Sequence, residues 1–281
     1  LLAFMVPTFG IYLANPILSL VDTACVGQFC SREELAALGP GAALCDMVTY
    51  LANFLAVATT SLLASALAKN DKEGARRVVA CAFTISTLIG LGMTAALTAF
   101  GRVMLGWFTG SGQAAADTLD LSMRYVLIRG LGSAPTLLCM VAQAACIGAK
   151  DADSPLRAVA ILAGVNIFLD WLFVGPLKTG VGGAAIATTI SQFAGAFYLY
   201  LAKRKGLFVI PTMKEFVKFF QFAGPIFLIS FGRGYCWNIC TPAAAAAGTI
   251  ALAAHQIVIN IFFFFTIAGE SVFQTAQAFM P

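Results

Sequence analysis

The chain alternates between long apolar runs and short polar connections. Long runs contain no Asp, Glu, Lys or Arg, among them residues 1–21, 47–68, 78–101, 130–149 and 179–202. Each run meets the requirement of roughly 20 residues for a helix that crosses ~30 Å of hydrocarbon. The strict alternation of apolar and polar residues that a membrane β-barrel needs does not occur. The pattern therefore predicts an all-α protein that crosses a membrane several times.

Clusters of Gly, Pro and charged residues separate the apolar runs and set the predicted helix boundaries. They place eight helices at 2–28, 36–69, 75–104, 118–148, 155–176, 181–203, 213–240 and 248–280. Pro16, Pro135 and Pro225 fall inside these helices. Membrane helices tolerate such prolines where a neighbour or a cavity satisfies the freed carbonyl.

Composition supports the membrane assignment and adds an orientation. Hydrophobic residues make up 60% of the chain and charged residues 11%, with a mean hydropathy of +0.88. The net charge of +4 does not indicate nucleic-acid binding, because the basic residues gather in alternate connections. These residues are Lys69, Lys72, Arg76, Arg77, Lys150, Arg157, Lys203, Arg204, Lys205 and Lys214. By the positive-inside rule, the second, fourth and sixth connections and the N-terminus face the cytoplasm, or the stroma in an organelle.

Four acidic residues interrupt the apolar stretches: Asp22, Asp46, Asp170 and Glu270. A carboxylate at bilayer depth costs about 3 kcal/mol on insertion scales, so it normally faces a polar cavity and handles ions or protons. Asn166 precedes Asp170 by four residues and therefore shares its helix face. Buried carboxylates beside polar partners indicate a transporter.

Other polar residues in the apolar runs have structural interpretations. We expect Asp46 to pair locally and Arg129 to pair with an acid or with backbone carbonyls. His255, the single histidine, is expected to be packed or interfacial. The eight cysteines show no CxxC spacing and are expected to be small apolar side chains.

The chain carries a faint internal repeat. Phe4-Met5-Val6-Pro7 followed by Leu35-Ala36-Ala37 is similar to Phe222-Ala223-Gly224-Pro225 followed by Leu252-Ala253-Ala254. The repeat predicts that helix 213–240 begins a second copy of a six-helix unit, as in transporters with parallel repeats. Because the chain begins at Leu1 and ends at Pro281 directly after a predicted helix, we expect a piece of a longer protein.

Several segments resemble the multidrug and toxic compound extrusion (MATE) family. They are Leu20-Val21-Asp22-Thr23, the stretch from Asn166 to Asp170, Gly183-Ala184-Ala185 and Ala187-Thr188. A narrower resemblance to the plant plastid-envelope branch rests on Gly39-Pro40-Gly41, Leu44-Cys45-Asp46, Ile128-Arg129-Gly130-Leu131, Ala253-Ala254-His255-Gln256 and Gly269-Glu270-Ser271. The family fold implies twelve helices in two lobes. Residues 1–203 would then form the N-terminal six-helix lobe and residues 204–281 the first two helices of an incomplete second lobe.

The resemblance also implies a function and a site. It implies a secondary antiporter that exports small organic compounds by alternating access, with H⁺ or Na⁺ as coupling ion and no other cofactor. Asp22, Asn166, Asp170 and Thr188 would bind that ion. Arg233, Glu270 and Gln256 would contact substrate or act in the second lobe, and the Arg233 cation favours an anionic substrate.

Two alternatives remain open from the sequence. One is a flippase for lipid-linked precursors from the same superfamily. The other is an intramembrane enzyme, which the lack of HExxH and GxSxG motifs disfavours. The expected partners are a small organic substrate and the lipid bilayer, in a plastid envelope or a plasma membrane. A monomer without nucleic acid is expected.

Overall fold

The computed structural model describes residues 2–109, 113–203, 211–246 and 249–280, and within the α9–α10 region it describes only part of the side chains. These ranges contain ten helices in chain order: α1 (Leu2–Phe29), α2 (Arg32–Leu51), α3 (Phe54–Ala68), α4 (Lys72–Thr109), α5 (Gln113–Leu131), α6 (Ser133–Gly148), α7 (Asp153–Val174), α8 (Val181–Lys203), α9 (Met213–Ala246) and α10 (Thr249–Phe279). The all-α class predicted from the sequence is confirmed.

Two of the eight predicted helices are broken in the structure. The helix predicted at 36–69 is divided by a turn at Ala52 and Asn53, whose N–H groups bond three residues back, to Thr49 and Tyr50. The helix predicted at 118–148 bends by 51° at Gly132. There Pro135 has no N–H to donate to the carbonyl of Leu131, four residues earlier. The other two prolines, Pro16 and Pro225, lie within continuous helices.

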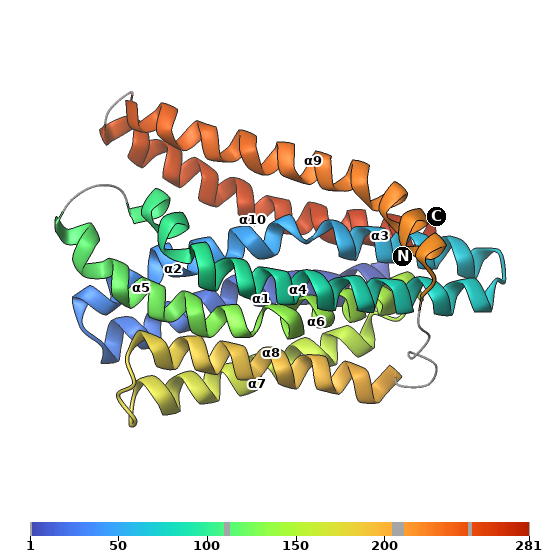
Figure 1. Cartoon of the computed structure of the whole chain (residues 1–281), viewed down its shortest axis with the longest axis horizontal. Coiled ribbons are helices and arrows are strands. Elements are labelled where there is room, and N and C mark those ends of the chain that lie inside the picture. Colours follow the sequence, from blue (N-terminus) through green and yellow to red (C-terminus); the bar gives the residue numbers. More distant parts are fainter. Residues whose placement is uncertain (1, 110–112, 204–210, 247–248, 281) are drawn as a thin grey trace.

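The helices run along the long axis of the molecule (Figure 1). Apart from the α2–α3 turn and the α5–α6 bend, which lie within spans, their connections alternate between its two ends. The α3–α4 and α6–α7 connections lie at the same end as both termini. This end is called the basic end here, because Lys69, Lys72 and Lys150 belong to those two connections. The alternation on which the positive-inside argument depends is therefore present.

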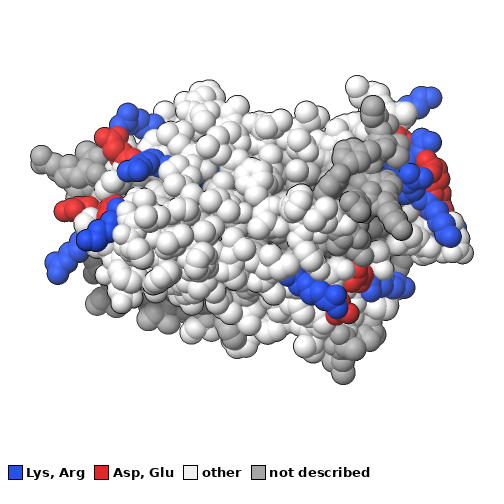
Figure 2. All heavy atoms as spheres, turned by 90° about the horizontal axis from the view of Figure 1, so that it is seen from below, with Lys and Arg blue, Asp and Glu red and all other residues white. Residues whose placement is uncertain are grey.

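An apolar belt surrounds the middle of the bundle. Figure 2 shows the charged side chains near the two ends, separated by a broad uncharged surface. The outward-facing residues of this belt include Leu88, Leu91, Phe168 and Phe197, each more than half exposed. Within the described residues, Phe4–Phe29, Arg32–Ala68, Lys72–Gly106 and Asp153–Val174 are long and apolar enough to cross a membrane, and the bent α5–α6 pair makes a fifth span.

Hydroxyl groups join the helices of the bundle across their buried faces. Ser122 of α5 donates to the Ala37 carbonyl of α2 at 2.8 Å, and Thr94 of α4 donates to the Gly130 carbonyl of α5 at 2.6 Å. Thr60 of α3 donates to the Ala144 carbonyl of α6 at 3.2 Å. Such bonds hold membrane helices together where the surrounding lipid is as apolar as the side chains.

Helices α9 and α10 pack as a pair against α1, α3 and α4 (Figure 1). Phe219 and Ala223 of α9 enter the apolar core formed by α3, α4 and α6, and Phe227 meets Phe54 edge to face at 5.3 Å. On α10, Ser271 donates to the Met5 carbonyl of α1 at 3.0 Å. Residues from the beginning of α9 and the end of α10 make these contacts, so they lie toward the basic end.

An ion pair adds to this contact at the basic end. Arg77 of α4 contacts Glu215 in the first turn of α9 at 2.7 Å, and its Nε also donates to Glu73 at 3.1 Å. The hydrogen bond from Arg77, with those from the Thr212 amide and hydroxyl, lowers the pKa of Glu215 to about 2. The pair therefore stays ionised at any pH that a cellular compartment reaches.

Candidate functional site

Three helices bring the predicted ion-binding residues together. Asp22 lies on α1, Asn166 and Asp170 on α7, and Thr188 on α8, and α7 packs against both other helices. Asn166 and Asp170 are fully buried, and Asp22 is 9% exposed. The Thr188 hydroxyl lies 3.4 Å from Asp22 Oδ2 and also donates to the Ala184 carbonyl at 2.9 Å. The i, i+4 spacing on α7 therefore presents both of its polar side chains toward α1.

Small residues allow this close approach. The start of α8 is rich in Gly and Ala, and Ala184, Ala185 and Ala187 are fully buried. A Cβ atom at Gly183 would lie 3.1 Å from Phe173 Cβ of α7. Small residues of this kind let membrane helices meet backbone to backbone. Their effect here is to bring Thr188 within reach of Asp22.

Most of the polar atoms in this group have no hydrogen-bond partner among the described residues. They are Asp22 Oδ1, both carboxylate oxygens of Asp170, and Oδ1 and Nδ2 of Asn166. Buried polar atoms are normally satisfied, so such a concentration calls for an explanation. The two carboxylates also lie within electrostatic reach of one another. Apart from the Asn166 Nδ2 donor, the group is therefore a cluster of oxygen acceptors that a proton or a small hard cation would satisfy.

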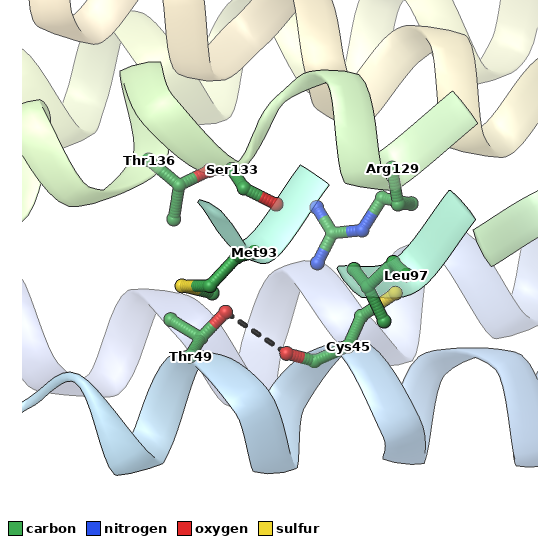
Figure 3. A pocket seen from close by; sticks show the side chains of 7 residues that line it. All are labelled: Cys45, Thr49, Met93, Leu97, Arg129, Ser133 and Thr136. Carbon is green, nitrogen blue, oxygen red and sulfur yellow. Dashed lines mark hydrogen bonds between the residues drawn. The ribbon is translucent and has the colours of Figure 1, made fainter. Parts of the chain in front are cut away.

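Arg129 and Asp46 interact electrostatically with the carboxylates of this cluster. Arg129 Nη2 is 3.7 Å from Asp46 Oδ1, which confirms the pairing expected for both residues. Figure 3 shows the guanidinium reaching from α5 into a space of about 10 Å³. The residues around it are Cys45, Thr49, Met93, Leu97, Ser133 and Thr136. From the sequence, Arg129 was expected to have only a structural role. Its electrostatic interaction with Asp22 and Asp170 was not predicted.

Glu270 belongs to a different polar group. It accepts a hydrogen bond from Gln274 at 3.2 Å and interacts electrostatically with Tyr12 of α1. The Oε1 atoms of Gln274 and Gln277 are buried without a partner among the described residues. Tyr12, Gln274 and Gln277 were not predicted as site residues. The two side-chain amides, Gln274 and Gln277, on an otherwise apolar helix could have indicated a polar site. The side chains of Arg233, His255 and Gln256 lie outside the described residues, so their predicted roles stay predictions.

Comparison with known families decides the identity of this helical bundle. The family model MatE matches residues 7–172. The chain belongs to the MATE family. Members of this family are transporters, and the integral membrane architecture predicted from the sequence agrees with this membership.

Plant proteins are among the relatives of this MATE chain. Protein DETOXIFICATION 47, chloroplastic, from Arabidopsis thaliana is 35% identical over 283 residues, which cover 99% of this chain and 52% of the relative. Protein DETOXIFICATION 44, chloroplastic, from the same plant is 28% identical and covers 95% of this chain and 53% of the relative. The chain thus spans about half the length of these relatives. Their chloroplast designation supports the predicted plastid envelope.

The fold is that of solved MATE transporters. The crystal structure of MATE in the bent conformation superposes with a TM-score of 0.86 at 22% identity, covering 99% of this chain and 62% of the other. Nearly all of this chain thus corresponds to less than two thirds of a MATE transporter. This agrees with the predicted two-lobe bundle whose second lobe is incomplete here.

Proposed function

We propose that the whole protein containing this chain is a secondary active antiporter, which exports small organic compounds in exchange for H⁺ or Na⁺. One observation carries the proposal: Asp22, Asn166 and Asp170 form a buried cluster in which every oxygen except Asp22 Oδ2 lacks a hydrogen-bond donor among the described residues. Intramembrane carboxylates of this kind mark ion and proton pathways. The family membership supports transport as the activity, and the detoxification and multidrug names of relatives support small organic substrates.

Alternating access supplies the mechanism that we propose. Residues 1–203 would form one lobe and residues from 204 onward the other. The contacts of α9 and α10 with the other helices, including the Arg77–Glu215 pair, would close the basic end in this state. Rocking of the lobes would open that end and close the other, and would thereby expose the Asp22–Asp170 cluster first to one side of the membrane and then to the other. The relatives' chloroplast designation leads us to propose the plastid envelope as the location.

A gradient experiment tests this function directly. The whole protein in liposomes should move a small organic substrate against an imposed H⁺ or Na⁺ gradient, and an ionophore that collapses the coupling gradient should stop it. Clamping the other gradient should have no effect, which identifies the coupling ion. Transport that continues without either gradient would contradict the proposal.

The charge of the substrate is a separate prediction. A fixed cation in the transport path repels cationic substrates in a low-dielectric cavity, so we propose that Arg233 on α9 favours organic anions. Arg233→Ala should weaken transport of an anionic substrate far more than transport of a neutral one, whereas Arg233→Lys should retain the preference. The measurement is the ratio of the two uptake rates in liposomes. Equal losses for both substrates would assign Arg233 a structural role.

A further inference from the structure

Arg129 is a buried charge that the proposed cycle has not used. Its side chain, on α5, is 16% exposed and lies 3.7 Å from Asp46 of α2. It interacts electrostatically with Asp22 of α1, Asp46 of α2 and Asp170 of α7. Tyr125 and Cys45 also face the guanidinium. Three carboxylates and one guanidinium leave this region negative when all are ionised.

The pairing of Arg129 is incomplete. Its separation from Asp46, 3.7 Å, exceeds the usual length of a hydrogen bond. The Asp46 side chain is also 69% exposed, which weakens the attraction. Arg129 Nε is buried and has no partner among the described residues. A buried charge is costly unless it is closely and completely paired, so Arg129 can still gain from a further acidic partner.

The carboxylates of the ion cluster lack hydrogen-bond donors, which Arg129 could supply. Arg129 offers five N–H donors in a planar fork, and Asp22 and Asp170 together have three oxygens without a donor. A guanidinium that turned away from Asp46 toward these oxygens would satisfy both sides at once. It would occupy the carboxylates in place of a proton or Na⁺.

The space beside the guanidinium is too small for a bound substrate. Its volume of about 10 Å³ is close to that of one water molecule. The hydroxyls of Thr49 and Thr136 donate to the carbonyls of Cys45 and Gly132 at 2.9 and 2.7 Å. Their oxygens therefore remain as acceptors beside the guanidinium. A substrate anion would find no room in this space, so the charge of Arg129 is available to the acids near it.

We infer that Arg129 is a tethered cation that competes with the coupling ion for Asp22 and Asp170, and that it rests on Asp46 while that ion is bound. The inference depends on the proposed function, because it requires that these carboxylates bind the coupling ion. The competition lowers the affinity of Asp22 and Asp170 for the coupling ion, which helps the ion to dissociate in each transport cycle. Asp46 is the residue that pairs with Arg129 while the coupling ion is bound. Arg129 is a positioning residue, because it acts on the ion through the carboxylates of Asp22 and Asp170.

A double-mutant cycle tests the inference in the whole protein in liposomes. The readout is the concentration of coupling ion that gives half the maximal transport rate. Arg129→Gln should lower this concentration by about tenfold or more, since a nearby opposite charge shifts ion binding at a carboxylate by at least that factor. Asp46→Asn should raise it several-fold, because the arginine loses its resting partner. In the Arg129→Gln background, Asp46→Asn should have almost no effect.

Non-additive effects of Arg129→Gln and Asp46→Asn on the half-maximal ion concentration distinguish competition by Arg129 from independent charge effects. Independent Coulomb contributions would make the two changes additive, and additivity would overturn the inference. An unchanged or weakened ion affinity in Arg129→Gln would also overturn it. If Arg129→Gln cannot be purified, Arg129→Met replaces it in the cycle, since an apolar side chain of similar length often substitutes for a buried ion. A wild-type protein without ion dependence would refute the proposed function and this inference together, whereas intact ion dependence with an additive cycle refutes the inference alone.

Discussion

Replacing Asp22 or Asp170 by Asn in the whole protein is expected to abolish gradient-driven export. Asparagine keeps the size and polarity of the side chain, so both variants should still insert and fold. It can neither take up a proton at neutral pH nor supply the negative charge that a Na⁺ ion needs. Each single change should reduce export in liposomes to the level of liposomes without protein, because the two carboxylates act on one ion.

Glu33→Gln is the matched control for these variants. Glu33 is an exposed carboxylate in the first turn of α2, and the same loss of charge there should leave transport nearly unchanged. Wild-type export by both Asp22→Asn and Asp170→Asn would refute the assignment. Attention would then move to Glu270 and its partner Gln274 on α10.

Gly90→Ala is expected to destabilise the bundle strongly. Gly90 of α4 packs against the backbone of α6, and an added Cβ would collide with Ala134 Cα and lie 2.9 Å from Ala134 N. Backbone atoms at a helix–helix contact cannot turn aside, so α4 and α6 would have to separate. Overpacking of this kind costs about 1–3 kcal/mol, and the cost here should lie toward the upper end.

Gly92→Ala provides the control on the same helix. A Cβ at Gly92 would meet nothing within 4 Å, so the change should be neutral or stabilise by about 1 kcal/mol through helix propensity. A thiol-reactive fluorophore can follow thermal unfolding of both variants in detergent, because Cys45, Cys81, Cys139 and Cys146 are buried. Equal unfolding temperatures for the two variants would show that α4 and α6 do not approach each other as closely as described.

The membrane-crossing helices could be predicted from the sequence because the bilayer imposes a length and a polarity on each segment. The last helix predicted for the first lobe, 181–203, has the same first and last residues as α8. The acids Asp22, Asp46, Asp170 and Glu270 could be singled out without a structure, because an acid at bilayer depth is costly. The choice of Asp22, Asn166 and Asp170 as the ion site came from the resemblance to the MATE family. The spacing of Asn166 and Asp170 was sufficient to place them on one face of α7.

Breaks within helices were only partly predictable. The bend at Gly132 has a sequence signal in Pro135, although the proline alone was interpreted as tolerated within one helix. The turn at Ala52 and Asn53 has no Gly or Pro. There α2 packs mainly against α5 and α3 mainly against α6, so the change of neighbour accompanies a break that local propensity does not indicate.

The sequence alone determined a helical membrane protein with acids inside its apolar helices, because hydrophobic length and the cost of a buried charge act on each segment separately. The resemblance to the MATE family added the expectation that Asp22 and Asp170 act together. Which residues surround that cluster depended on the tertiary structure. Arg129 is 107 positions from Asp22, and only the packing of α5 against α2 and α8 brings its guanidinium within reach of the carboxylate. Gly90 and Gly92 are likewise equivalent in a sequence, and the fold alone turns one toward α6 and leaves the other in open space.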